Sequence, residues 1–399
     1  MTPVLRGRRL LAAILALGLG GFGIGVTEFT IMGLSQEVAA GLNVSISTGG
    51  NLISAYALGV VVGAPLITVA CARMPRKQLA LGLMALFTLG NLSSVIAPDY
   101  TTMLITRFIS GLPHGAYFGI AAIIAASLVP SSMRGRAIAW VMLGLSVANV
   151  LGVPLVTRIG QSLGWRWMFV AVAVIGVLTF LAILRFVPFA PAEEGTSMKR
   201  ELSALARPQV WLAMGTGIVG FGGFFAVYAY ISPIMTDVAG LPLESMPFIL
   251  ALYGIGMVAG SILGGRLADW SVRGSVLAGL VVVILVQLAF WALAPFAVPI
   301  LILTFVLGAA GAMLVPGLQT LLMDSAPGAQ SLAASLNHSA LNVANALGAA
   351  LGGFVLQTEL GLRGTALAGA GLAVAGLVIA VIALLAARRT SATVPGTLN

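Results

Sequence analysis

Residues 145–152 read LSVANVLG and residues 341–348 read LNVANALG, so six of the eight positions are identical. The two segments begin 196 residues apart, at positions 145 and 341. A second pattern, Tyr-x-x-Gly-x-x-x-Gly, begins at Tyr56 and again at Tyr253, 197 residues later. Several matches at nearly one offset, in the same order, are hard to obtain by chance. They indicate that the chain contains a duplicated unit.

The duplicated unit is made of long apolar stretches. The chain has 399 residues, of which 59% are hydrophobic and only 8% are charged. A soluble domain carries about a quarter charged residues, so most of this surface must face lipid. Each transmembrane helix needs roughly 20 apolar residues. Stretches of this kind, separated by short polar breaks, fall near residues 10–34, 49–72, 78–97, 101–129, 137–157, 167–188, 209–234, 246–266, 275–295, 299–322, 333–356 and 365–387.

The spacing of the repeat predicts the architecture. An even number of spans, six, separates the two copies, so both copies cross the membrane in the same direction. We therefore predict an all-α membrane protein of twelve transmembrane helices in two pseudo-symmetric six-helix halves. The halves are residues 1–189 and 209–399, joined by a polar cytoplasmic linker at 190–208. In transporters with this kind of repeat, the substrate site lies between the halves near the middle of the membrane.

The positive charge of the chain indicates its orientation. The net charge is +9, but the basic residues form small clusters between apolar stretches and no groove-sized patch, which argues against nucleic acid as a partner. When loops are assigned alternately from a cytoplasmic N-terminus, sixteen Lys and Arg residues fall inside and three fall outside. Because cytoplasmic loops carry the excess of basic residues, we predict a multi-pass inner-membrane protein with both termini in the cytoplasm.

The reactive residue types are too few and too scattered for an enzyme. Cys71 is the only cysteine, which excludes an internal disulfide and a cysteine metal site. The two histidines, His114 and His338, lie in separate apolar segments without a carboxylate at ligand spacing. No Walker A sequence is present. We expect no catalytic residues, no metal and no cofactor, with the proton gradient as the energy source.

Two charged residues lie within apolar stretches. An ionisable group inside the bilayer costs several kcal/mol and is a functional candidate by default. Glu28 lies about 9 Å below the outer end of its span, and Arg107 lies at about the same depth in another. Burial and a nearby cation act in opposite directions on a carboxyl group, so Glu28 could load and release a proton. The alternatives are a structural ion pair or an interfacial carboxylate held by Thr27 and Thr30.

His114 follows Arg107 by seven residues, so both lie on one helical face. A histidine can change its charge near neutral pH and could relay the proton, or it could only hydrogen-bond between helices.

One span carries a polar stripe. His338, Asn342 and Asn345 recur at positions i, i+4 and i+7 of the span at 333–356, and Asn149 is the counterpart of Asn345 in the repeat. Lipid would penalise such a stripe, so we expect these four side chains to line the substrate cavity.

Two tyrosines are also candidates for the substrate cavity. Tyr56 and Tyr253 are related by the repeat and lie in mid-span, where they could contact the cavity. Tyr228 and Tyr230 lie nearer the outer end of the span at 209–234, where an interfacial aromatic belt is the expectation.

The chain resembles one transporter family over essentially its whole length, and two motifs carry the resemblance. Gly25-Val26-Thr27-Glu28-Phe29 resembles the G-T-T-E-F signature of the drug:proton antiporters of the arabinose-efflux-permease and chloramphenicol-resistance type, in the major facilitator superfamily. Arg107-Phe108-x-x-Gly111-x-x-His114-Gly115 resembles the motif B of that group. The resemblance implies the twelve-span fold and roles in proton coupling for Glu28, Arg107 and His114.

Further segments resemble the motifs that this family uses for conformational change. Gly265-Arg266-Leu267-Ala268-Asp269 is similar to the start of motif A. The loop after the second span keeps Arg73, Arg76 and Lys77 but has Ala72 where an acidic residue is expected. Gly152-Val153-Pro154 resembles part of the antiporter motif C. The resemblance implies conformational roles for these residues: Arg73, Arg76, Gly152, Pro154, Gly265 and Asp269.

These observations together predict a proton-coupled secondary transporter that exports small hydrophobic or amphiphilic compounds, as in drug efflux, by alternating access. One alternative keeps the mechanism and changes the cargo to sugars, sugar derivatives or nucleosides. Another is a membrane sensor or scaffold that transports nothing. The expected partners are a small-molecule substrate, protons and the lipid bilayer, and we expect a monomer.

Overall fold

The computed structural model describes residues 5–71, 74–130, 133–189, 203–326 and 330–392. Within these ranges every regular element is a helix. The first half contains α1 (Gly7–Gly33), α2 (Ser35–Gly41), α3 (Ile46–Ala70), α4 (Arg76–Val95), α5 (Tyr100–Ser127), α6 (Arg134–Val147), the π-helix η2 (Ala148–Gly152), α7 (Val153–Leu163) and α8 (Trp167–Phe186).

The second half repeats this series after the predicted linker, most of which (190–202) lies outside the described residues. It contains η3 (Ser203–Ala206), α10 (Pro208–Tyr228), α11 (Ile231–Pro233), η4 (Ile234–Val238), η5 (Leu243–Ser245), α12 (Met246–Trp270), α13 (Val272–Leu293), α14 (Ala297–Ser325), α15 (Gln330–Val355) and α16 (Gly361–Ala392).

The helices match the predicted spans. Among the described residues, 11 helical segments are long and apolar enough to cross a membrane. The helix at the remaining predicted span, α15, has 26 residues but carries the polar stripe, which lowers its hydropathy. The all-α membrane fold is therefore confirmed. The structure adds the short helix α2 and a π-helical turn at η2 inside the predicted fifth span.

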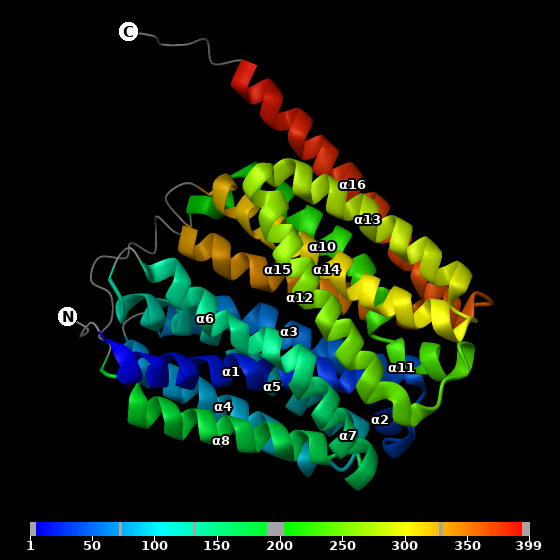
Figure 1. Ribbon diagram of the computed structural model, residues 1–399, viewed down its shortest axis with the longest axis horizontal. Helices are drawn as coiled ribbons and strands as arrows, with labels where there is room; N and C mark the ends of the chain where they lie inside the picture. Colours follow the sequence, from blue (N-terminus) through cyan, green and yellow to red (C-terminus); the bar gives the residue numbers. More distant parts are fainter. Residues whose placement is uncertain (1–4, 72–73, 131–132, 190–202, 327–329, 393–399) are drawn as a thin grey trace.

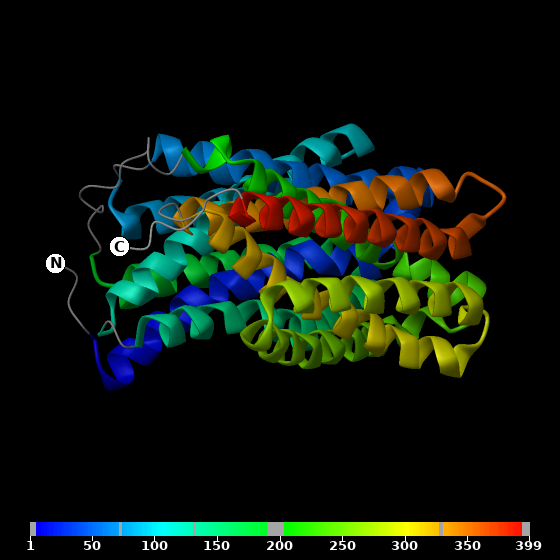
Figure 2. The same cartoon turned by 90° about the horizontal axis from the view of Figure 1, so that it is seen from above.

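The two halves use the same helix pairs. Figures 1 and 2 show long helices running side by side, with the first half, coloured blue through cyan to green, next to the second half, coloured green through yellow to red. In the first half α3 packs on α5, α4 on α8, and α1 on α6 and α8. In the second half the corresponding helices pair in the same way: α12 on α14, α13 on α16, and α10 on α15 and α16. The duplication seen in the sequence is therefore a duplication of packing.

Glycine explains why the Tyr-x-x-Gly pattern occurs twice. A Cβ atom at Gly59 of α3 would clash with the backbone carbonyl of Phe108 in α5. A Cβ atom at Gly256 of α12 would clash with the carbonyl of Phe305 in α14 in the same manner. Small residues allow helix backbones to approach closely in lipid, where no hydrophobic force drives the helices together.

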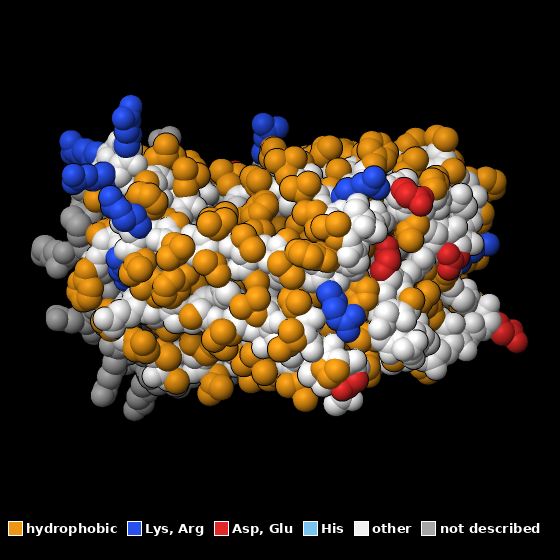
Figure 3. All heavy atoms as spheres, turned by 90° about the horizontal axis from the view of Figure 1, so that it is seen from below, with side chains coloured by type: hydrophobic (Ala, Val, Ile, Leu, Met, Phe, Trp, Pro, Cys, Tyr) orange, Lys and Arg blue, Asp and Glu red, His pale blue; other side chains and the backbone are white. Residues whose placement is uncertain are grey.

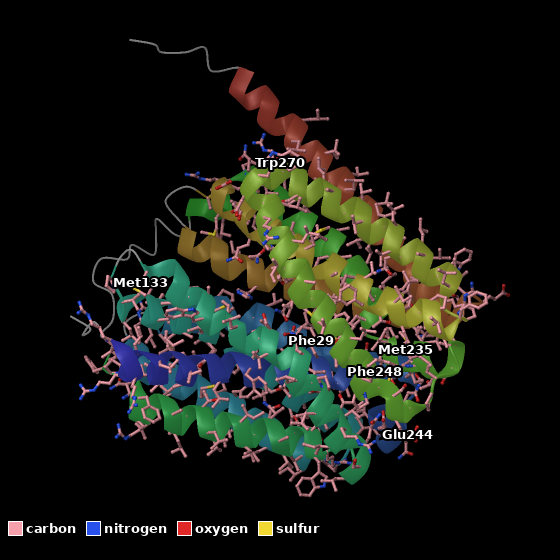
Figure 4. All side chains as sticks on the ribbon, in the orientation of Figure 1. Phe29, Met133, Met235, Glu244, Phe248 and Trp270 are labelled. Atoms are coloured by element: carbon pink, nitrogen blue, oxygen red, sulfur yellow. The ribbon has the colours of Figure 1, made fainter. Side chains whose placement is uncertain are left out.

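We call the end of the bundle where α1 begins the inner end and the opposite end the outer end. Figure 3 shows hydrophobic side chains over the middle of one face, with the largest group of Lys and Arg at the inner end and the Asp and Glu toward the outer end. In Figure 4, Met133 lies at the inner end and Glu244 at the outer end. This distribution agrees with the orientation predicted from the basic residues.

The two halves are joined at the outer end. Ser47 Oγ donates to the carbonyl of Gly353 at 2.7 Å, and Gln161 Nε2 donates to the carbonyl of Leu243 at 2.8 Å. Gln36 donates to Thr236 between α2 and η4. A further bond between the halves, from Ser54 Oγ to the carbonyl of Ala346 at 3.3 Å, also lies in the outer half of the bundle. The structure is therefore closed on its outer side.

Replacing Gly254 by alanine is expected to open the outer end. A Cβ atom at this position of α12 would clash with the backbone carbonyl of Asn149 in η2, and overpacking of this kind costs about 1–3 kcal/mol. The closed arrangement should lose at least about fivefold in population. Faster alkylation of a cysteine placed at Ser54, in a chain with Cys71 replaced by serine, would report the opening. Gly119→Ala is the matched control because a Cβ atom there meets nothing within 4 Å. Equal rates for both variants would contradict the prediction.

Candidate functional site

Glu28 lies where the two halves meet. It belongs to the part of α1 in which every residue from Gly23 to Gly33 is buried, and its own exposed fraction is 7%. Its carboxylate interacts electrostatically with Arg107 of the first half and with Tyr228 and Tyr253 of the second.

The side chain of Asn345 approaches the same carboxylate from α15. Neither polar atom of Asn345 reaches hydrogen-bond geometry with any described group. Groups from both halves therefore surround this one carboxyl, and a rearrangement of the halves would change its surroundings.

Arg107 is fully buried and fixed by several contacts. Its Nη1 donates to Thr27 Oγ1 at 3.1 Å, and its Nη2 donates to the Thr27 carbonyl at 3.3 Å. Thr27 Oγ1 in turn donates to Asn91 Oδ1 at 2.7 Å. The guanidinium carbon lies 4.4 Å from the ring centroid of Tyr56 and 5.8 Å from that of Phe169, within cation–π range.

Arg107 and Glu28, which the sequence places at matching depth, interact electrostatically, but their contact is indirect. Arg107 holds Thr27, the residue before Glu28, and no ion pair within 4 Å joins the two charges among the described residues. The carboxylate therefore lies in the electrostatic field of Arg107 without an ion-pair contact to it.

A row of rings continues from this pair to the other half. Tyr56 Oη lies 3.1 Å from His114 Nδ1, and the two ring centroids are 5.8 Å apart. The His114 ring lies 5.4 Å from Phe118, and Phe118 stacks on His338 at 5.5 Å with an interplanar angle of 2°. His114 is thus one contact away from Arg107 through Tyr56, and His338 of α15 closes the row from the second half.

Aromatic side chains of the second half form the other side of the site. The rings of Tyr228 and Tyr253 stack at 4.0 Å, and Phe224 lies 5.8 Å from Tyr228 and 5.9 Å from Tyr253. Phe29, the neighbour of Glu28 on α1, lies 5.9 Å from Tyr228. Figure 4 labels Phe29 among the helices of the interior. The aromatic cluster therefore adjoins the carboxyl group.

The expected interfacial belt at Tyr228 and Tyr230 is wrong. Both side chains are buried, with exposed fractions of 0% and 1%. The reason is that α10 ends at Tyr228: the chain turns there into α11 and η4, which pack against α1, α2 and α16. Tyr230 Oη donates to the carbonyl of Ala349 in α15 at 2.7 Å.

The polar stripe faces the protein interior and leaves several polar atoms without partners. Asn149 Nδ2 and Asn342 Nδ2 each donate to the carbonyl four residues earlier, at 3.0 and 2.9 Å. Buried polar atoms normally have partners, so each exception needs an explanation. Among the described residues, the buried side-chain atoms near the site that lack a partner include Thr30 Oγ1, Arg107 Nε, Asn149 Oδ1, Tyr228 Oη, Tyr253 Oη, Asn342 Oδ1, and Asn345 Oδ1 and Nδ2.

The motif residues fall in two places. A Cβ atom at Gly152 would press on Val26 and Phe22 of α1, so this glycine lets η2 pack beside the Glu28 segment. Pro154 is in the first turn of α7, directly after η2. By contrast, Arg76 begins α4 and Asp269 lies exposed near the inner end of α12, so neither reaches the site.

The other two motif residues do not add to the site either. Gly265 is in the same inner part of α12, with open space around its α-carbon. Arg73 lies outside the described residues.

The family follows from a comparison of the whole sequence. Two overlapping segments, residues 17–299 and 248–397, match the family described as Major Facilitator Superfamily. Together they cover most of the chain. The chain belongs to the major facilitator superfamily. It is therefore a secondary transporter and not an enzyme.

Two relatives agree with this family, and a solved structure has a similar fold. The chain is 42% identical over 348 residues to the inner membrane transport protein YdhP of Escherichia coli K12, covering 87% of this chain and 90% of the relative. It is 35% identical over 343 residues to a chloramphenicol resistance protein of Streptomyces lividans, covering 85% and 86%. The crystal structure of a bacterial homologue of the human lysosomal transporter Spinster, inward-facing and unoccupied, is similar in fold, with a TM-score of 0.75 at 18% identity over 95% and 96% of the two chains. The protein is thus a multi-pass transporter of the inner membrane.

Several residues of the candidate site were not predicted from the sequence. In the sequence, Phe118 is only an aromatic residue four positions after His114, on the same helical face. Its stack on His338 depends on how the two halves meet. Phe224 lies in a run of apolar residues that carries no signal of its own. Thr27 stands in the G-V-T-E-F segment, where the neighbouring Glu28 carries the stronger signal. Each of these is an ordinary membrane residue whose role comes from a tertiary contact.

A second carboxyl group of the transporter lies at the closed outer end. Both carboxylate oxygens of Glu37, in α2, are buried and lack a hydrogen-bond partner among the described residues. Burial raises the pKa of Glu37 above its ordinary value of 4.5, with Gln161 beside it as a smaller opposing influence. Gln161 is also the residue that bonds to Leu243 across the halves.

Closure of the outer end should therefore depend on pH. In the closed form the buried Glu37 carboxyl binds its proton more tightly than it would when hydrated in the open form. Closure is therefore fully favoured below pH 4.5, and it weakens as the pH rises through the raised pKa of Glu37. Glu37→Gln should remove this dependence. The distance between spin labels at the exposed residues Ile96 and Leu360, measured by pulsed electron paramagnetic resonance across a pH series, reports closure of the outer end. Glu244→Gln, an exposed carboxylate of η5, is the control and should keep the wild-type profile. An unchanged profile in Glu37→Gln would refute the assignment.

Proposed function

We propose that this transporter exports small hydrophobic or amphiphilic compounds in exchange for protons, by alternating access. The observation that carries the proposal is the position of Glu28, a buried carboxyl between the halves with Arg107 nearby but not in ion-pair contact. The stacked rings of Tyr228 and Tyr253 lie next to it. A compound resting on those rings would occupy the space beside the carboxyl, so cargo and proton would compete for one site.

The exchange follows from this competition. With the outer end closed, cargo from the inner side displaces the proton of Glu28, and the charged carboxylate is then stabilised by Arg107. After the halves rearrange, a proton from the outer side returns to Glu28 and the cargo leaves. The membrane potential supplies about 2.3 kcal/mol per charge per 100 mV, and each pH unit about 1.4 kcal/mol.

The aromatic character of the site favours a drug-like cargo. Phe29, Phe224, Tyr228 and Tyr253 offer ring faces to a flat apolar molecule or an organic cation. The resistance protein of Streptomyces lividans, named for chloramphenicol, supports the same class of compound.

A second cargo class is favoured by a different observation. The side chains of Asn149, Tyr228, Tyr253, Asn342 and Asn345 all hold polar atoms without partners among the described residues. Neutral donors and acceptors of this kind match the hydroxyl groups of sugars, sugar derivatives or nucleosides. Such a cargo would gain hydrogen bonds at these positions and would use the same proton exchange.

The test is a compound screen on proteoliposomes with an imposed pH gradient, read by a pH-sensitive dye inside the vesicles. The proposal expects proton movement on addition of apolar or amphiphilic compounds, whereas movement only with polyhydroxylated compounds would favour the second class. If no compound of either class moves protons, in vesicles where the protein is shown to be folded and correctly inserted, the transport proposal is wrong.

A further inference from the structure

A cavity lies in the second half, away from the site around Glu28. Its volume is about 350 Å³, and it lies between the first turns of α10 and α13, the last turn of α14 and the inner part of α16. None of the residues discussed for transport lines it. Figure 1 labels α10 and α14 beside α13 and α16 in the upper part of the view.

The polar part of the cavity is basic. Arg207 and Arg273 line it, and Asp324 is the only described acidic residue that does so. Neither guanidinium forms an ion pair or hydrogen bond with another described residue. The lining therefore carries one net positive charge, made up of two arginines against one aspartate. The amino-terminal ends of α10 and α13 also face this region and favour negative charge.

The rest of the cavity is apolar and continues into the lipid-facing surface. Leu212, Leu277, Leu321 and Leu384 line it below the arginines. Beside Leu384, the side chains of Ile382 and Leu385 are exposed on α16, with exposed fractions of 51% and 54%. A ligand here would have its charged part at the inner end, where head groups lie, and its apolar part along the membrane.

We propose that this cavity binds an anionic phospholipid of the cytoplasmic leaflet, with its phosphate held by Arg207 and Arg273 and an acyl chain against the leucines. Basic pockets between transmembrane helices on the cytoplasmic side suit such head groups. A soluble phosphate compound would satisfy the arginines alone and would leave the apolar wall unused. This inference does not depend on the proposed transport function.

The experiment is native mass spectrometry of the purified full-length transporter with phosphatidylglycerol or phosphatidylcholine of equal chain length. Wild-type protein should prefer phosphatidylglycerol. Each basic charge near a membrane surface changes anionic lipid binding by about fivefold, so the double variant Arg207→Gln/Arg273→Gln should lose roughly thirtyfold in affinity. Asp324→Asn should change binding in the opposite direction and strengthen it by about fivefold.

The controls separate this site from a general charge effect. Arg8→Gln/Arg185→Gln removes two exposed arginines at the inner end of the first half, outside the cavity, and should bind as wild type. Arg207→Lys/Arg273→Lys should keep most of the preference, which shows that loss in the glutamine variant is not misfolding. Equal loss in the first-half control, or no loss in the glutamine variant, would overturn the proposal. Binding of inorganic phosphate as tight as that of the lipid would overturn it in favour of a soluble ligand.

Discussion

Glu28→Gln is expected to abolish proton-coupled export while the protein still folds and inserts. Glutamine has nearly the shape of the protonated carboxyl and keeps a hydrogen-bonding group beside Asn345, but it cannot release a proton. Cargo should still bind, because the rings of Tyr228 and Tyr253 are unchanged. The measurement is proton release on addition of an active compound to reconstituted vesicles, together with binding of that compound. Release should vanish and binding should remain.

The matched control for this variant is Glu359→Gln, a carboxylate exposed near the outer end, outside the helices. It carries the same chemical change without the burial, and it should transport as wild type. Full activity of Glu28→Gln would remove the basis of the antiport mechanism, although the fold would stand. Loss of both binding and proton release would instead mean that residue 28 mainly shapes the cavity.

Arg107→Gln is expected to reduce transport by at least about a hundredfold. The variant loses two hydrogen bonds to Thr27 and the cation–π contact with Tyr56. Hydrogen bonds to charged groups contribute about 1.5–3 kcal/mol each, so Thr27 and the adjoining Glu28 would no longer be held. Arg107→Lys should recover only part of the activity, because an ammonium cannot reach two acceptors with the planar geometry of a guanidinium. Initial transport rates under one fixed pH gradient give the comparison.

The structure offers a close control for this arginine. Arg166 donates to the carbonyl of Ala97 at 3.0 Å and lies 4.1 Å from the ring centroid of Trp165, so it makes the same kinds of contact near the outer end of the bundle. Arg166→Gln should affect stability without affecting proton coupling. If both variants lose transport in equal measure, and in proportion to their loss of thermal stability, Arg107 has only a structural role.

The architecture could be predicted because it depends on features that single residues report. Lipid requires long apolar helices, and the close approach of α3 to α5 and of α12 to α14 requires glycine at the repeated positions Gly59 and Gly256. Glu28 and Arg107 were visible for the same reason, since a charge in an apolar stretch is costly and is rarely kept without a functional role. In these cases the chemistry of one position is enough.

The rest of the site depends on contacts between distant segments. The turn of the chain after Tyr228 follows from the packing of α11 and η4, and no local pattern distinguishes it from a helix that runs on to the membrane surface. The stack of Phe118 on His338 depends on the distance between halves in this conformation. The indirect contact of Arg107 with Glu28 through Thr27 depends on side-chain geometry that equal depth in the membrane does not determine.

The two repeat copies are wound differently, although their sequences are nearly the same. Residues 148–152 form a π-helical turn, whereas the copy at 344–348 is an uninterrupted part of α15. A π-helical turn contains one residue more than an α-helical turn. If this extra residue moves to a neighbouring turn of the helix, the side chains and carbonyls between the old and new positions rotate by about 100° about the helix axis. Such a step would swing the Asn149 carbonyl away from Gly254, on which the closed outer end depends. The helix of the first half can therefore rotate about its π-helical turn at residues 148–152, whereas α15, its counterpart in the second half, stays a continuous α-helix.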